Sequence, residues 1–140
     1  MPKYFTFEEL WQSATADKLG IDNKPSAEIA FRLGFLAADL DAIREAWKSG
    51  IIVSSGYRCP ELNEAVGGSE TSCHKLGWAV DLQPANGEIE EFKVFMVDYF
   101  KDKPFDQLLL ESAGNTQWVH YSKYNSKGKQ RCQCFKITKD

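Results

Sequence analysis

The chain contains two histidines, and both occur in sequence surroundings suited to metal binding. Asp81 follows His74 by seven positions, and Gly77 between them lets the backbone turn tightly from a loop into a strand. Imidazole nitrogen and carboxylate oxygen are good zinc ligands, and three protein ligands leave a fourth position for water. His120 supplies the third ligand if the fold brings it near. The sequence therefore predicts a catalytic zinc site at His74, Asp81 and His120.

Glu111 is the candidate for proton transfer during hydrolysis. Two strand-like segments flank Gly114-Asn115, a pair that favours a tight hairpin turn. With a loop of residues 114–117, Glu111 pairs directly with His120, and directly paired residues share one face of a sheet. We therefore expect Glu111 beside the metal, as the general base that takes a proton from the attacking water. A slip of one residue would place the two on opposite faces.

Each of these residues also has an ordinary structural interpretation. The two histidines can be hydrogen-bonded residues without a metal, and Asp81 can cap the turn before Pro84. Glu111 can be a solvated carboxylate at a strand end, and Arg58 can be a surface ion-pair partner. The motif H-E-x-x-H is absent, which excludes the zincin class of metallopeptidases. Spacing alone leaves both interpretations open.

The bulk composition predicts one domain over residues 1–140 that folds without help from a metal. The 140 residues are 43% apolar and 13% aromatic, enough for a substantial core. The 17 basic and 20 acidic residues give a net charge of −3 without a basic run, which argues against nucleic-acid binding. No C-x-x-C pair occurs among the four cysteines, so we expect free thiols and no structural zinc knuckle.

The sequence also indicates where in the cell the protein is made. No apolar run is long enough to span a bilayer, and the first residues lack the apolar core of a signal peptide. We therefore expect a protein made in the cytoplasm without a recognisable signal peptide. If it acts outside the cell, something other than a standard signal must release it.

The elements that must position these residues form an α+β pattern. Thr6 and Glu9 make a capping box before a short helix that fades near Ala14. Ser26 caps a long helix, which Gly50 ends. Its apolar positions alternate spacings of four and three: Ile29, Leu33, Leu36, Leu40, Ile43 and Trp47. Further helices are expected over residues 60–66 and 89–99, and strands over 51–53, 78–82, 108–111, 118–122 and 131–137. The prediction is a small, mainly antiparallel sheet flanked by helices.

Several motifs taken together closely resemble the M15 zinc peptidases. The patterns S-G-Y-R, S-x-H-x-x-G-x-A-x-D and W-x-H occur in that order, as Ser55-Gly56-Tyr57-Arg58, Ser72 to Asp81 and Trp118-Val119-His120. Phe105-Asp106-Gln107-Leu108 matches a recurrent stretch of the small phage-like branch, and residues 14–23 also fit. The resemblance thus covers nearly the whole chain. The family includes D-alanyl-D-alanine carboxypeptidases, dipeptidases and phage endolysins that cut L-alanyl-D-glutamate bonds.

The resemblance implies a Hedgehog/DD-peptidase-like fold and zinc at the three residues that spacing also indicates. It implies that Arg58 lies near the substrate, where a guanidinium can bind a carboxylate or stabilise a developing oxyanion. Ser72 and Trp118 are expected to line the same site, although Ser72 is equally consistent with a turn residue. The small size and phage-like motifs further imply an endolysin-type protein that reaches the cell wall after phage-type release.

One departure from the family pattern concerns the catalytic acid. Many members carry Asp or Glu three residues before the last histidine, but here that position is Gln117, which cannot act as a base. Glu111 is the remaining candidate. The leading interpretation is a monomeric zinc metallopeptidase acting on peptidoglycan stem peptides, as a carboxypeptidase or an L-alanyl-D-glutamate endopeptidase. The alternative is a catalytically weak zinc-containing module that binds wall peptides or a partner.

Overall fold

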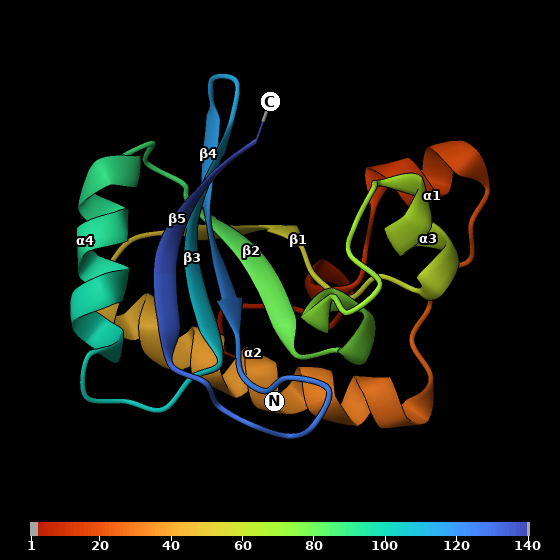
Figure 1. The fold of residues 1–140 in the computed structure, drawn as a ribbon, viewed down its shortest axis with the longest axis horizontal. Coiled ribbons are helices and arrows are strands. Elements are labelled where there is room, and N and C mark those ends of the chain that lie inside the picture. Colours follow the sequence, from red (N-terminus) through yellow and green to blue (C-terminus); the bar gives the residue numbers. More distant parts are fainter. Residues whose placement is uncertain (1–2, 140) are drawn as a thin grey trace.

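A five-stranded sheet runs through the middle of the computed structural model, which describes residues 3–139 (Figure 1). The strand order is β1-β2-β4-β3-β5. The strands are β1 (Ile51–Ser55), β2 (Ala79–Pro84), β3 (Gln107–Ala113), β4 (Thr116–Ser122) and β5 (Gln133–Lys139). All neighbouring pairs are antiparallel except β3 and β5, which run parallel. The predicted α+β class with a mainly antiparallel sheet is confirmed.

Helices lie on either side of this sheet. They are α1 (Ala14–Leu19), α2 (Ala27–Trp47), α3 (Pro60–Ala65) and α4 (Ile89–Phe100), with short 3₁₀ turns η1 (Glu8–Leu10) and η2 (Cys73–Leu76). Figure 1 shows α2 crossing beneath the sheet and α4 standing at one side of it, while α1 and α3 lie together at the opposite end. Residues of α1 and α3 form one boundary of the site described below.

The long helix α2 packs one row of buried residues into the core. The Ser26 hydroxyl accepts the Ile29 N–H at 3.3 Å, as expected of an N-cap. The predicted apolar stripe is confirmed, since its four central members are completely buried: Leu33, Leu36, Leu40 and Ile43. The helix ends earlier than expected, because Lys48 adopts the left-handed conformation (φ 65°) that the sequence had suggested for Gly50. On α4, Phe92 packs edge-on against Trp47 at 5.1 Å between ring centroids.

The N-terminal segment differs from the prediction in one respect. The capping box is present, with the Glu9 N–H donating to Thr6 Oγ1 at 3.2 Å and the Thr6 N–H donating back to Glu9 Oε1 at 3.2 Å. It starts only the 3₁₀ turn η1, and a separate helix α1 follows, capped by Ser13. Six residues without an apolar repeat gave no periodic signal for α1.

The β3–β4 hairpin has a different register from the predicted one. Ala113 pairs with Thr116 across a two-residue turn of Gly114 and Asn115, so Glu111 lies opposite Trp118 and Leu109 lies opposite His120. Gly114 takes a positive φ of 60°, which suits the first position of a tight hairpin turn. The prediction was wrong by two residues, and a shift of two keeps every side chain on its original face. Glu111 and His120 therefore remain on the same side of the sheet, as diagonal neighbours.

Candidate metal centre and catalytic cleft

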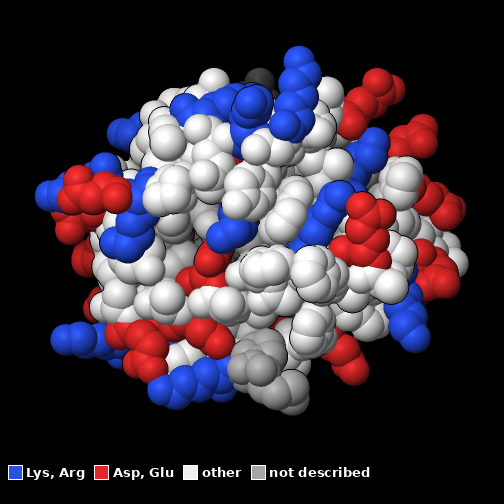
Figure 2. Space-filling model, turned by 90° about the horizontal axis from the view of Figure 1, so that it is seen from below, with Lys and Arg blue, Asp and Glu red and all other residues white. Residues whose placement is uncertain are grey.

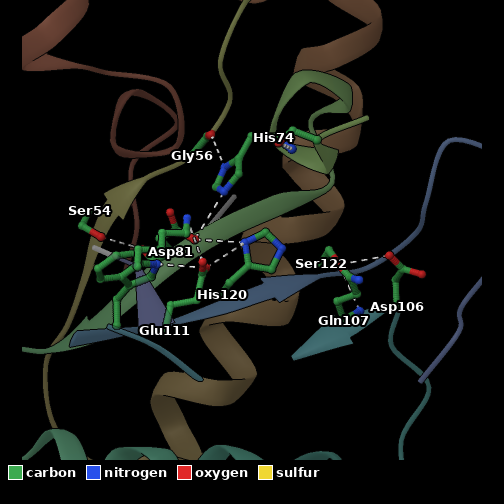
Figure 3. Close-up of polar contacts among 12 residues, drawn as sticks. Ser54, Gly56, His74, Asp81, Asp106, Gln107, Glu111, His120 and Ser122 are labelled. Atoms are coloured by element: carbon green, nitrogen blue, oxygen red, sulfur yellow. Dashed lines mark hydrogen bonds and ion pairs between the residues drawn. The ribbon is translucent and has the colours of Figure 1, made fainter. Parts of the chain in front are cut away.

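Two neighbouring strands, β2 and β4, bring together residues that lie 39 positions apart. Asp81 of β2 pairs directly with His120 of β4, and His74 reaches the same point from η2 (Figure 3). Asp81 Oδ1 lies 3.0 Å from His120 Nδ1 and 3.3 Å from His74 Nε2. The ligand atoms of the three residues all lie within 4.8 Å of one another. All three predicted ligands converge on one point.

Backbone contacts fix the orientation of His74. The Gly56 carbonyl accepts a hydrogen bond from His74 Nδ1 at 2.8 Å, which leaves the Nε2 lone pair directed at Asp81. The Ser72 hydroxyl accepts the His74 N–H at 3.2 Å, and the Arg58 N–H donates to the His74 carbonyl at 3.1 Å. Gly77 ends the 3₁₀ turn with φ 77°, a conformation that glycine adopts without strain. The S-G-Y-R and S-x-H segments are thus hydrogen-bonded to each other.

Gly56 is also required because no side chain fits at this position. A Cβ at this position would lie 2.1 Å from the Leu10 carbonyl oxygen, which accepts the Tyr57 N–H at 2.7 Å. Because the clash is with backbone atoms, it cannot be relieved by a side-chain rotation. The close approach of β1 to η1 thereby holds the carbonyl that orients His74.

The electrostatics of the trio favour a neutral His74 and an ionised Asp81. Burial lowers the pKa of His74, which is only 2% exposed, and Asp81 opposes that shift only in part. Burial raises the pKa of Asp81, but the His74 and His120 imidazoles outweigh burial and leave the pKa well below its ordinary value. A neutral imidazole and a carboxylate are the protonation states in which these groups bind a metal.

The donor set fits a zinc ion. Ligand atoms that hold zinc tetrahedrally at ~2 Å lie roughly 3.3 Å apart, close to the two separations between Asp81 and the imidazoles. Two imidazoles and one carboxylate form a three-ligand set of the kind that leaves a position open for water, as in catalytic zinc sites. His74 also has the backbone hydrogen bond on its other nitrogen that metal-binding histidines usually have. The residues present therefore suit a catalytic divalent metal.

Glu111 lies beside this centre on the same face of the sheet. It is 5% exposed, and its Oε2 lies 4.0 Å from His120 Nδ1. The Trp118 indole N–H donates to that oxygen at 3.0 Å, and Lys139 Nζ lies 3.0 Å from the other carboxylate oxygen. Glu111 thus has the placement expected of an acid next to the metal that does not itself bind it.

Gln117, at the position of the acid in many family members, faces away from the centre. Its side chain contacts Lys93 of α4, and its carbonyl accepts the Gln83 side-chain amide at 2.9 Å. In a regular strand, residues three apart point to opposite faces. With His120 directed into the site, position 117 is turned toward α4 and away from the three candidate ligands.

A cleft of about 1040 Å³ opens over the centre. Its lining includes the trio, Glu111 and the three residues predicted to contact substrate: Arg58, Ser72 and Trp118. Arg58 Nε is buried and has no hydrogen-bond partner among residues 3–139. Burial lowers the pKa of Arg58, while Asp81 and Glu111 oppose this shift. The wall of the cleft therefore contains a buried guanidinium nitrogen without a partner.

Some residues of the site were not singled out from the sequence. Gly56 belongs to the S-G-Y-R motif, but no sequence signal indicates that its carbonyl orients His74. Lys139 is the last residue of the exposed strand β5, and no sequence signal indicated its contact with Glu111. Cys73, adjacent to a ligand, turns toward Asp106 instead, with Sγ 3.7 Å from Oδ2, and burial raises the pKa of its thiol to about 11.

The outer surface of the protein has a mixed charge distribution. On the face shown in Figure 2, acidic and basic side chains are interspersed around the rim, and uncharged residues fill much of the centre. None of the helices within residues 3–139 combines the length and the apolar character needed to cross a bilayer.

Comparison with known proteins identifies the family. A comparison with curated proteins finds no match. The family model of Peptidase M15 matches residues 3–122, a span that contains β1 to β4, the three candidate metal ligands and Glu111. Metal dependence is typical of this family, and the His74-Asp81-His120 cluster agrees with it. Because the match covers most of the chain, the protein belongs to the peptidase M15 family.

Proposed function

We propose that this protein is a zinc-dependent peptidase that hydrolyses the stem peptides of peptidoglycan. The observation that carries the proposal is the convergence of His74, Asp81 and His120 beside the buried acid Glu111. Membership of the family alone implies peptidase activity. These four side chains supply the groups that metal-assisted hydrolysis needs. No other constellation within residues 3–139 gathers three metal-binding side chains in this way.

His74, Asp81 and His120 would hold the ion. When bound, zinc supplies Lewis acidity toward a carbonyl oxygen and lowers the pKa of a water molecule. Glu111 accepts the proton of the attacking water and returns it to the leaving amine. Its oxygens are held by the Trp118 indole and by Lys139, so the carboxylate stays directed at the centre.

Arg58 is proposed to bind the substrate. Its buried, unpartnered Nε lies in the wall of the cleft, where a peptide carboxylate or the developing oxyanion would supply the missing partner. Ser72 and Trp118 line the same cleft and would contact the bound peptide there. The motif resemblance to wall carboxypeptidases and endolysins supports stem peptides as the substrate, with either the terminal D-alanine bond or the L-alanyl-D-glutamate bond cut after phage-type release.

Digestion of purified peptidoglycan tests the proposal. Wild type, Glu111→Gln and the exposed control Glu64→Gln are compared for bound zinc by elemental mass spectrometry and for released muropeptides by liquid chromatography with mass spectrometry. We expect all three to bind one zinc and only Glu111→Gln to lose cleavage, by roughly 10²–10⁴-fold. The masses of the products identify the bond. A zinc-loaded wild type that binds several wall preparations but cleaves none would establish the alternative, a binding module.

A further inference from the structure

The C-terminal strand β5 forms a wall of the cleft, although it lies beyond the residues that match the family model. It runs parallel to β3, with Phe135 opposite Leu109 and Ile137 opposite Glu111. Paired residues of neighbouring strands share a face, so Phe135 and Ile137 border the cleft together with Leu109 and Glu111. Lys139, two residues further along the same face, also borders the cleft. The strand therefore adds residues to a site whose metal-binding part is complete without it.

An ion pair between a buried carboxylate and an exposed arginine anchors the start of this strand. Asp106 is fully buried and accepts hydrogen bonds from Arg131 Nε at 2.7 Å and Nη2 at 2.8 Å. The Cys132 N–H donates to the Phe105 carbonyl at 3.0 Å, and the Gln133 N–H donates to the Asp106 carbonyl at 2.9 Å. Paired, geometrically fixed groups of this kind leave little freedom to slide, so the register of β5 against β3 is set at its first residue.

At the other end of β5, Lys139 meets the proposed general base. Its Nζ lies 3.0 Å from Glu111 Oε1, while the Trp118 indole N–H donates to Oε2 at 3.0 Å. The same ammonium lies 5.6 Å from the centre of the Trp118 ring. Each oxygen of the buried carboxylate thus has one donor, and Oε2, which can accept a second hydrogen bond, also lies 4.0 Å from His120 Nδ1.

We propose that Lys139 is a positioning residue, which fixes the rotation of the Glu111 carboxylate so that one oxygen faces the metal centre. The proposal rests on the proposed function of Glu111 as the base. Without Lys139, one oxygen of the buried Glu111 carboxylate loses its hydrogen-bond donor. An unsatisfied buried oxygen is costly, which favours rotation of the carboxylate toward other donors. Proton transfer requires a well-aligned acceptor, so a misdirected carboxylate slows the chemical step more than it weakens substrate binding.

A purely structural role explains this contact less well. The Lys139 side chain is 55% exposed, and ion pairs with exposed partners contribute little to the free energy of unfolding. Lys136, three residues earlier on the same strand, pairs with Leu110 instead and forms no ion pair with any residue in the range 3–139. It provides a matched control for removing one lysine from β5.

The kinetic test compares Lys139→Met, Lys139→Arg and Lys136→Met on a defined muropeptide. We expect Lys139→Met to lower kcat by roughly tenfold, with KM, bound zinc and melting temperature unchanged. Lys136→Met should stay within about twofold of wild type, and Lys139→Arg should recover most of the activity because it keeps the cation. An unchanged kcat in Lys139→Met would overturn the proposal. So would a raised KM at constant kcat, which would make Lys139 a substrate-binding residue.

A second readout works without any hydrolysis. The indole N–H signal of Trp118, identified by its loss in Trp118→Phe, reports the hydrogen bond to Glu111 in two-dimensional NMR spectra. We expect Lys139→Met to shift this signal more in the wild-type background than in Glu111→Gln, because only the former carries a charged carboxylate to redirect. Equal shifts in the two backgrounds would mean that Lys139 acts on the ring alone, and the proposal would fall. If wild type proves inactive on every substrate while the signals behave as expected, the proposed function fails and the positioning contact stands.

Discussion

Zinc should stabilise this protein strongly, and the gain should depend on Asp81. The ligand atoms already lie within 4.8 Å of one another, so the folded chain presents a preformed site that the unfolded chain lacks. At free zinc about a hundred times the dissociation constant, binding adds about 2.7 kcal/mol to the free energy of unfolding. A domain of this size gains roughly 3–4 °C per kcal/mol. The melting temperature should therefore rise by roughly 8–11 °C.

The substitution Asp81→Asn removes the anion that both imidazoles face. If the affinity for zinc falls about a hundredfold, the same zinc concentration adds only about 0.4 kcal/mol, or roughly 1–2 °C. Glu111→Gln is the matched control, because its carboxylate lies beside the ligands without joining them, and it should keep the full shift. Differential scanning calorimetry with and without zinc measures both. A full zinc shift in Asp81→Asn, or its loss in Glu111→Gln, would refute the assignment of ligands.

Three further predictions concern residues that hold the site in place. Asp106→Asn should lower the free energy of unfolding by about 2–4 kcal/mol, because a buried carboxylate loses its charged hydrogen bonds to Arg131. Urea denaturation measures this loss. The control is the exposed Asp98→Asn, which should stay within about 0.5 kcal/mol of wild type. Burial raises the pKa of Asp106, but the Arg131 hydrogen bonds outweigh it and the net pKa is lowered. Its stabilisation is therefore present above the unfolded pKa of about 3.9 and lost as the pH falls through the lower folded value. Urea midpoints of wild type and Asp106→Asn should accordingly converge below about pH 4, and a constant gap would contradict the ion-pair account. Gly56→Ala should lower the free energy of unfolding by at least about 2 kcal/mol and reduce bound zinc, because the new Cβ would lie 2.1 Å from the Leu10 carbonyl oxygen. Calorimetry measures the stability and elemental analysis the bound zinc. A variant with unchanged stability and full zinc content would show that β1 can move away from Leu10.

The candidate metal ligands could be named from the sequence because each is specified by local chemistry. Two histidines and an aspartate in a family-like order left few other choices. Their direct pairing across β2 and β4 could not be derived, since it depends on which strands become neighbours in the sheet. The resemblance supplied the convergence that spacing alone left open.

The hairpin shows why a partly wrong register still gave the right neighbour for His120. The Gly-Asn pair indicated a turn, but its length decides the pairing, and a four-residue loop was expected where two residues suffice. The error equalled one full repeat of a strand's side-chain pattern, so the face assignment of Glu111 was preserved.

Long-range contacts account for most of what the sequence did not indicate. β5 joins β3 in parallel after a connection from Ser122 to Gln133, and its seven residues are largely exposed, so no alternating pattern marked either its partner or its direction. Its predicted start at Arg131 was early by two residues, because Arg131 turns back to Asp106 and Cys132 takes a positive φ of 53°. Contacts made by an exposed strand end, such as that of Lys139, leave no trace in hydropathy.

The clustering of every histidine of the chain around one carboxylate makes the protein unusually convenient for spectroscopy. With only His74 and His120 in the sequence, each imidazole resonance, each proton taken up by an imidazole and each event of histidine-selective chemical modification arises at the candidate metal centre. Occupancy of the centre by different divalent ions can then be followed in solution from two signals with no background to subtract, before any substrate is known.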